Sequence, residues 1–336
     1  MKAVVYQGQR QVELKNIAAP ELTPDSVLID VEACGICGSD LHMYREDWKP
    51  EICTIPYPEG RVPGHEFAGY LAAVADENCG HQVGDRVVGL AMGGMAERVS
   101  VSQWALFPIP DNVSFDEAAT AEPMSNSLRI ARKSQAQAGE NVVVFGMGII
   151  GLGVIQAYQA LDIELNQLIA VDTSDYRLEV AKLLGADHVI NPKECNVHQA
   201  VQGLVGTRES ILDGDTPAVD IVCDCVGYIK GFPGKPVLQQ ALDMICDRTG
   251  RIMCFGMFEG NVELNLDSLI NRQPSIIGVM GMEMDDVRDA LAFMSEGRID
   301  RKSLVTHSYP IGECGDAFEA QTNYADSVKV VLHPQE

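Results

Sequence analysis

The residues with the richest chemistry lie in two short stretches near the start of the chain. Residues 34–42 read CGICGSDLH, and residues 64–66 read GHE. These stretches supply thiols, imidazoles, a hydroxyl and carboxylates, a set that includes the usual ligands of a zinc ion. A catalytic zinc takes three protein ligands and leaves its fourth position open to water or substrate. We predict an open zinc site with Cys37 and His65 as two of its ligands.

A third ligand is expected at the edge of the second domain. Glu122 stands in the segment AEPM, residues 121–124, which otherwise reads as an apolar helix. An ionised carboxylate in such surroundings is costly unless a metal or another partner satisfies it. We therefore predict Glu122 as the third ligand, and Glu66, next to His65, as a fourth and exchangeable one.

A glycine-rich stretch follows the strand-like run NVVVF directly, and residues 146–151 read GMGIIG. Gly146, Gly148 and Gly151 allow a tight turn between a strand and a helix. The helix is expected to begin near Ile149 and Ile150, where backbone N–H groups can approach a pyrophosphate. The pattern predicts a dinucleotide-binding loop.

Asp172 ends the next strand-like run, LIAVD, twenty-one residues after Gly151. A carboxylate there accepts hydrogen bonds from an adenosine ribose and repels a 2′-phosphate, so it favours NAD over NADP. Arg177, five residues later, offers a cation that leaves NADP possible. We predict NAD as the cofactor, with Asp172 and Arg177 at its ribose.

The elements that must position these residues follow two patterns. Up to about residue 110, alternating or β-branched runs such as SVLIDVEACG are separated by Gly, Pro and Asp, with no helical period. They predict an antiparallel, partly closed β-domain. After a capping box at Ser114 and Glu117 and a helix over about residues 125–138, strands alternate with helices. Such alternation predicts a parallel sheet covered on both faces.

The chain ends on two further strand-like runs. SIIGVMG, residues 275–281, reads as one more buried strand of the parallel sheet, and SVKVVLH, residues 327–333, as a strand that returns to the first domain. We therefore expect an α/β fold in which a doubly wound cofactor domain, residues 128–280, is inserted into a catalytic β-domain made of residues 1–127 and 281–336.

Composition excludes several classes of protein. The chain has 336 residues, with 25 basic against 48 acidic side chains and a net charge of −23, which repels nucleic-acid phosphates and anionic lipids. No apolar run reaches the roughly 18 residues that a membrane span needs, and the first 20 residues resemble no export signal. The ten cysteines are therefore read as mostly reduced. We expect a cytoplasmic protein that binds a small molecule, and neither nucleic acid nor membrane.

Taken together, CGICGSDLH, GHE, AEP and the glycine loop after NVVVF resemble the zinc-dependent medium-chain dehydrogenase family, in its alcohol and polyol dehydrogenase branch. The resemblance covers nearly the whole chain. It implies a Rossmann domain inserted in a GroES-like, partly closed β-barrel domain. It also implies Cys37, His65 and Glu122 as zinc ligands, with Glu66 able to enter the coordination sphere. A carboxylate at position 122 is similar to sorbitol, glucose and threonine dehydrogenases.

The resemblance also assigns roles around the metal. A bound alcohol must pass its proton from a dry site to solvent. Ser39 would accept that proton, and His42 would relay it through the cofactor ribose. Asp40 would accept a hydrogen bond from the free ring nitrogen of His65. Cys34 is read as a packing residue.

One feature of the family is missing from the sequence. In much of the family a lobe with four closely spaced cysteines binds a structural zinc. Here the run GDRVVG, residues 84–89, leads within a few residues to GMAE, residues 94–97. We therefore expect one catalytic zinc per chain, no structural zinc, and a homodimer or homotetramer.

The expected substrate is a polyol, cyclitol, sugar-derived or other secondary alcohol, because residues 43–63 form a polar loop and Glu122 resembles the polyol branch. Candidates for the pocket wall are Tyr44, Arg45, Asp47, Trp48, Tyr57 and Arg61, with Asn126 and Arg129 just past Glu122. The aromatic members read equally well as packing residues. The alternatives are a threonine or amino-alcohol dehydrogenase on the same scaffold, and a cofactor-binding relative without turnover.

Overall fold

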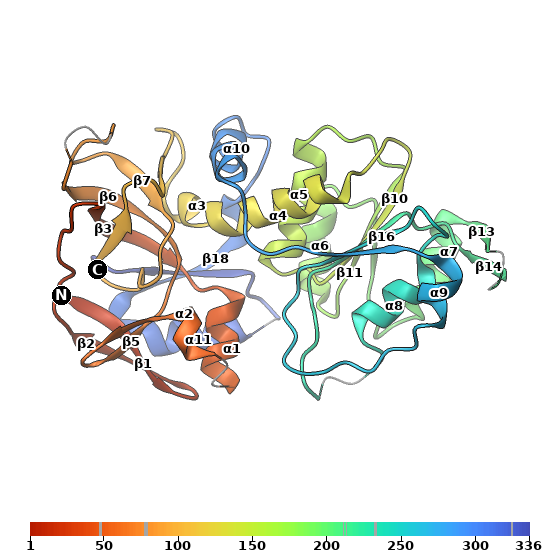
Figure 1. The fold of residues 1–336 in the computed structure, drawn as a ribbon, viewed down its shortest axis with the longest axis horizontal. Helices are drawn as coiled ribbons and strands as arrows, with labels where there is room; N and C mark the ends of the chain where they lie inside the picture. Colours follow the sequence, from red (N-terminus) through yellow and green to blue (C-terminus); the bar gives the residue numbers. More distant parts are fainter. Residues whose placement is uncertain (47–48, 77–79, 211, 213, 232–233, 324) are drawn as a thin grey trace. The chain divides into compact units, whose positions relative to one another are not determined.

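The structure is a computed structural model that describes residues 1–336 apart from 47–48, 77–79, 211, 213, 232–233 and 324 (Figure 1). Its contacts divide the chain into two units. The first unit is Met1–Pro123 together with Val287–Glu336, and the second is Met124–Asp286. The second unit is thus inserted between two parts of the first. The boundaries expected from sequence, after residues 127 and 280, lie a few residues away.

The first unit is built around strand β3, Ser26–Gly35. One edge of β3 pairs with β6, Glu66–Val74, and the other pairs with β8, Arg98–Ser102, and then with β19, Lys329–His333. Register irregularities between β3 and β6 bend the sheet. Because β19 comes from the C-terminal end, the last strand of the chain completes the N-terminal sheet, as predicted (Figure 1).

The strand orders within this unit are β2-β1-β5-β4 and β18-β19-β3-β6-β7-β9. Its other elements are β1 Lys2–Gly8, β2 Gln11–Asn16, α1 Gly38–Glu46, α2 Pro50–Cys53, β4 Ile55–Tyr57, β5 Gly60–Val62, β7 Arg86–Gly89, β9 Leu106–Pro108, α3 Phe115–Ala119, η1 Lys302–Leu304, β18 Val305–Pro310, η2 Ile311–Glu313 and α11 Cys314–Thr322. Helix α10, Met284–Ser295, crosses the boundary between the units. The core of this unit includes Cys34, which is fully buried among apolar side chains, as predicted.

Helices α1 and α2 interrupt the strand-rich first 110 residues, although the sequence there shows no helical period. Helix α1, Gly38–Glu46, begins directly after the end of β3 and contains most of the CGICGSDLH stretch. It is nine residues long and buries only Asp40, Leu41, Met43 and Tyr44. So few apolar positions leave no helical period for a sequence pattern to detect.

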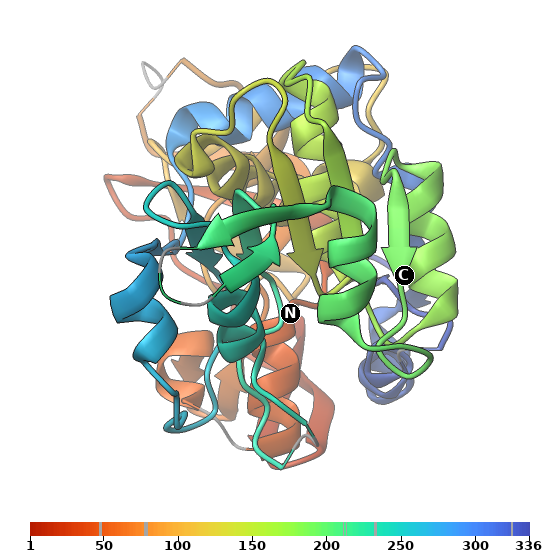
Figure 2. The same cartoon turned by 90° about the vertical axis from the view of Figure 1, so that its right-hand side faces the viewer.

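The second unit contains a parallel sheet with the order β12-β11-β10-β15-β16-β17 (Figure 2). Its elements are α4 Ala121–Ser134, which begins in the first unit, β10 Asn141–Phe145, α5 Ile149–Ala160, β11 Gln167–Val171, α6 Asp175–Leu183, β12 His188–Ile190, α7 Val197–Val205, β13 Thr207–Ser210, β14 Gly214–Pro217, β15 Ile221–Asp224, α8 Val237–Met244, β16 Arg251–Cys254, α9 Asp267–Arg272 and β17 Ser275–Gly278. The chain starts at β10, runs outward to β12 and returns to β15 on the other side of β10. The loop after β10 is therefore at the switch point where α/β sheets bind their ligands.

Three details of this unit differ from the prediction. Helix α4 begins at Ala121 and ends at Ser134, because Gln135 adopts a left-handed backbone conformation with φ of 52°. Strand β17 is a largely exposed edge strand, not a buried one, since no described strand lies beyond it. Helix α7 and the β13–β14 hairpin were not expected. The capping box of Ser114 and Glu117 is confirmed. No helix in the described ranges is both long and apolar enough to cross a membrane.

Candidate metal centre and cofactor loop

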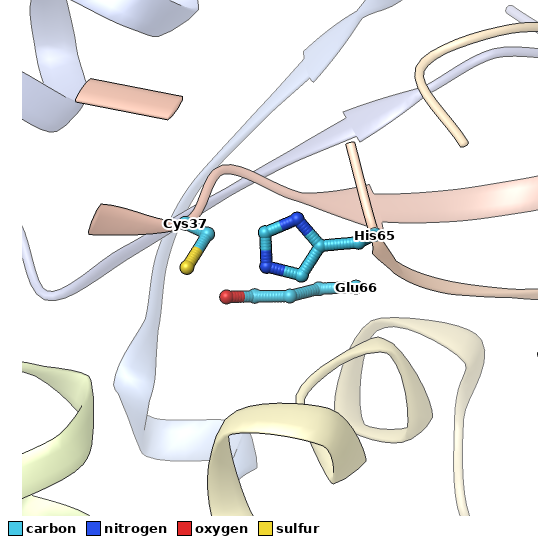
Figure 3. Close-up of side chains that lie close together, drawn as sticks. All are labelled: Cys37, His65 and Glu66. Carbon is cyan, nitrogen blue, oxygen red and sulfur yellow. The ribbon is translucent and has the colours of Figure 1, made fainter. Parts of the chain in front are cut away.

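Cys37, His65 and Glu66 come together in the first unit because β3 and β6 are antiparallel. Gly35 at the end of β3 pairs with Glu66 at the start of β6, so the chain just after β3 lies beside the chain just before β6. One ligand atom from each of the three side chains lies within 4.8 Å of the other two. Figure 3 shows the thiol, the imidazole and the carboxylate pointing toward one another.

Two glycines make this approach possible. A Cβ atom on Gly35 would lie 2.5 Å from Glu66 Oε2, inside van der Waals contact. Gly64 has φ of 93°, and a Cβ there would lie 2.8 Å from the backbone nitrogen of Met95. Residues with side chains at these positions would push Glu66 or His65 out of place.

Cys37 is positioned by the start of helix α1. The carbonyl of Cys37 accepts the hydrogen bond from Leu41 N–H at 3.2 Å, and Asp40 Oδ2 accepts from Cys37 N–H at 2.9 Å. Asp40 thus reaches back to the residue that begins the helix, as the acid of a capping box does.

The predicted hydrogen bond between Asp40 and His65 is not made in this structure. Neither Asp40 Oδ1 nor His65 Nδ1 has a hydrogen-bond partner among the described residues, and Asp40 is fully buried. The carboxylate oxygen of Asp40 that does form a hydrogen bond, Oδ2, caps α1. Burial raises the pKa of Asp40, and His65 and the N–H of Cys37 oppose that shift.

His65 lies in a strongly anionic environment. Burial by itself lowers the pKa of His65, but the hydrogen-bonded Cys37, Asp40 and Glu122 together raise it well above its usual value. Since Nδ1 lacks a partner, the nitrogen that faces Cys37 is Nε2. A proton or a metal ion between these two atoms would satisfy the same electrostatic demand.

Glu66 is fully buried and forms an ion pair with Lys329 of β19. Lys329 Nζ donates to Glu66 Oε2 at 2.6 Å and to the carbonyl of Ile36 at 2.8 Å. The other oxygen, Oε1, has no hydrogen-bond partner in the described part of the chain. A buried carboxylate oxygen without a donor is rare, and a bound cation is one way to satisfy it.

The other residues expected at the metal lie close by. Glu122, half-buried in the first turn of α4, is near enough to raise the pKa of His65, but it is not among the three side chains within 4.8 Å. Ser39 and His42 stand three residues apart on α1 and so share one helix face. The buried Ser39 Oγ has no hydrogen-bond partner among the described residues.

The glycine loop of the second unit has the geometry that its motif predicts. Gly146 has φ of 87°, and a Cβ on Gly151 would lie 1.8 Å from the carbonyl oxygen of Gly146. Gly148 precedes the first turn of α5 with no side-chain cap, so the N–H groups of Ile149 and Ile150 remain available at a helix N-terminus. The backbone can therefore approach a diphosphate closely here.

Asp172 lies directly after β11, beside this loop. Its Oδ2 accepts from Met147 N–H at 2.6 Å and its Oδ1 from Ser174 N–H at 2.8 Å. Each oxygen keeps a second lone pair with which a ribose hydroxyl could bond. Arg177 is also beside the loop, because its guanidinium lies 3.9 Å from where a Cβ on Gly148 would stand.

Comparison with known proteins agrees with this geometry. Residues 23–111 match the model of the alcohol dehydrogenase GroES-like domain, and residues 150–296 match that of the zinc-binding dehydrogenase. Sorbitol dehydrogenase of Bacillus subtilis (strain 168) is 28% identical over 99% of this chain and 97% of its own length. The chain belongs to the zinc-dependent medium-chain dehydrogenase family.

Two further members of this dehydrogenase family are similar to the chain over its whole length. L-threonine 3-dehydrogenase of Yersinia enterocolitica is 26% identical over 99% of both chains. The crystal structure of 2R,3R-butanediol dehydrogenase from Bacillus subtilis matches with a TM-score of 0.81, 28% identity and 99% coverage of each chain. These matches span both units, so the family assignment covers the whole fold.

Several side chains expected to line the dehydrogenase pocket have structural roles. Tyr44 donates to Glu319 at 2.7 Å and packs on Phe318, and Arg61 donates to Thr54 at 2.8 Å. Arg129 pairs with Glu283, and Asn126 is buried. Asp47 and Trp48 lie outside the described residues. These side chains therefore stabilise the fold, whether or not some of them also contact a substrate.

Sequence reasoning missed two cations near the candidate metal centre, Lys329 and Arg301. Both are fully buried, and Glu66 interacts with each of them. A lysine inside the apolar strand SVKVVLH was the available signal, because a buried charge needs a partner. The partner, Glu66, is 263 residues away in sequence and could not be named from it.

Proposed function

We propose that this chain is a zinc-dependent oxidoreductase that transfers a hydride between NAD and a polyol, cyclitol, sugar-derived or other secondary alcohol. The observation that carries the proposal is the convergence of Cys37, His65 and Glu66 to within 4.8 Å at one end of the β3–β6 pair. Thiolate, imidazole and carboxylate are the donor set of catalytic zinc. The unpartnered Glu66 Oε1 and the anionic surroundings of His65 also fit a bound cation.

In this proposal Cys37, His65 and Glu122 would hold the ion, and Glu66 could serve as an exchangeable fourth ligand. A zinc ion there would polarise the alcohol oxygen and make its proton easier to remove. Ser39 Oγ would accept that proton, and His42, one turn along the same face of α1, would pass it toward solvent. Asp40 fixes the backbone of Cys37. We assign one zinc to each chain and no structural zinc.

The cofactor assignment follows from the loop after β10. Its glycines and the uncapped start of α5 would bind the diphosphate, and Asp172 would accept from the ribose. Arg177 beside Gly148 is a cation that a 2′-phosphate could use, so NADP is the second choice. The homo-oligomer and the cytoplasmic location stay predictions.

The similarity to a sorbitol and a butanediol dehydrogenase supports the secondary-alcohol assignment. A threonine-type dehydrogenase is the alternative, since a threonine 3-dehydrogenase is similar at 26% identity. A panel of sorbitol, inositol, 2,3-butanediol and L-threonine with NAD and NADP, with NADH formation as the readout, separates the two. Elemental analysis should find about one zinc per chain. Protein without metal and without alcohol-dependent NADH would refute the proposal.

A further inference from the structure

Arg301 is among the largest fully buried side chains of the protein, with no exposed surface. It directly precedes the short helix η1 in the first unit. Burial lowers the pKa of Arg301 to about 10, while Glu66 and then Asp300 oppose that shift. A guanidinium removed from water is costly unless charge and hydrogen bonds compensate it, so its neighbours identify its role.

Arg301 and Glu66 are both fully buried in the first unit, and the charge of Glu66, a carboxylate of the metal cluster, opposes the effect of burial on the pKa of Arg301. Glu66 therefore has two buried cations around it, Lys329 by a 2.6 Å hydrogen bond and Arg301 by its charge.

Arg301 also contacts the start of the helix that carries Glu122. Its Nε donates to Thr120 Oγ1 at 3.1 Å, and Thr120 Oγ1 donates to the carbonyl of Glu117 at 2.7 Å. Thr120 is fully buried, ends α3 and directly precedes α4, whose second residue is Glu122. The guanidinium thus joins the η1 segment to the junction from which Glu122 projects.

The balance of charges around Glu66 also supports a role for Arg301 at the metal cluster. Cys37, Asp40, Glu66 and Glu122 are anionic when ionised, and Lys329 and Arg301 are the buried cations that interact with Glu66. A divalent ion among them would make the group neutral. Without Arg301 the group would keep an uncompensated negative charge, which is unfavourable in a buried site.

We propose that Arg301 is a positioning residue of the metal centre, which orients Glu122 through its hydrogen bond to Thr120 and adds a buried positive charge to the anionic ligand group. The proposal rests on the metal site of the proposed function. Neighbours that orient metal ligands typically change metal affinity by about 10–100-fold when they are removed. Arg301→Met should therefore weaken divalent metal binding by about that factor. Arg301→Lys, which keeps the charge but not the bond to Thr120, should recover part of it.

The test is a titration of the metal-free full-length protein with Co²⁺, followed by the thiolate-to-cobalt absorption that Cys37 would produce. The matched control is Arg298→Met, an exposed arginine three residues earlier that stacks on Phe293. Weaker binding in Arg301→Met, partial recovery in Arg301→Lys and wild-type binding in Arg298→Met support the proposal. Wild-type or tighter binding in Arg301→Met overturns it.

Thr120→Val keeps the experiment decisive if Arg301→Met does not fold. This variant keeps the buried charge of Arg301 but removes the acceptor of its Nε bond, together with the Thr120 bond to the Glu117 carbonyl. It should weaken Co²⁺ binding by about threefold or more. Unchanged binding in both Thr120→Val and Arg301→Lys would overturn the proposal. The alcohol and NAD assay is separate, because a wild-type protein that binds Co²⁺ but forms no NADH refutes the proposed function and leaves the Arg301 titration valid.

Discussion

Removing Lys329 should destabilise the first unit strongly, because it would leave Glu66 buried without its hydrogen-bonded cation. At most 1% of the surface of either side chain is exposed, and Lys329 Nζ also donates a hydrogen bond to the carbonyl of Ile36. Breaking a buried ion pair by removing one partner typically costs about 3–5 kcal/mol. We therefore expect Lys329→Met to lower the free energy of unfolding of this unit by about that amount.

The pair can be separated from simple packing by a second variant. Lys329→Met combined with Glu66→Gln removes both charges, and since isosteric neutral replacements of a buried pair are often near neutral, most of the loss should return. Guanidinium unfolding, read by hydrogen exchange of peptides from β3, β6 and β19, measures this unit separately from the other. Lys302→Met, at an exposed lysine of η1, is the control.

Two results would refute this reasoning. A loss below about 1 kcal/mol in Lys329→Met would mean that the pair is worth no more than an exposed one. A double variant as unstable as the single one would mean that the lysine acts through packing or through Ile36, and not through the charge of Glu66.

Three further predictions concern other parts of the molecule. Cys37→Ser should lose most of the metal and the turnover but keep NAD binding, measured by elemental analysis and calorimetry; unchanged turnover would contradict the ligand assignment. Gly151→Ala should cost at least about 1–3 kcal/mol and abolish NAD binding, because its Cβ would lie 1.8 Å from Gly146 O; wild-type NAD affinity would contradict this. The hydrogen bond to Asp116 raises the pKa of His333, so its contribution, about 0.5 kcal/mol after solvent screening, is present below the unfolded pKa and is lost as pH rises through the folded one. His333→Gln should remove that pH dependence, and a variant with the wild-type profile of stability against pH would disprove it.

Local patterns in the sequence are sufficient to predict much of this protein's structure. The glycine loop, the strand NVVVF before it and Asp172 after β11 occur within one short segment, so their spacing alone predicts the second unit. The capping box at Ser114 is likewise a matter of four consecutive residues. Cys37 and His65 could be named because possible metal ligands cluster in two short stretches, residues 34–42 and 64–66.

Tertiary structure decides what depends on residues far apart in the chain. Local sequence patterns do not encode three of the features described above. They do not say whether Asp40 bonds His65 or caps α1, or whether β17 is buried or at the sheet edge. They also do not say which cations surround Glu66. Lys329 and Glu66 meet only because β19 and β6 each pair with β3. The sequence by itself indicated which residues could bind a metal and a dinucleotide. The fold alone decided which buried charges lie beside them, because a charge removed from water is stable only next to a compensating partner.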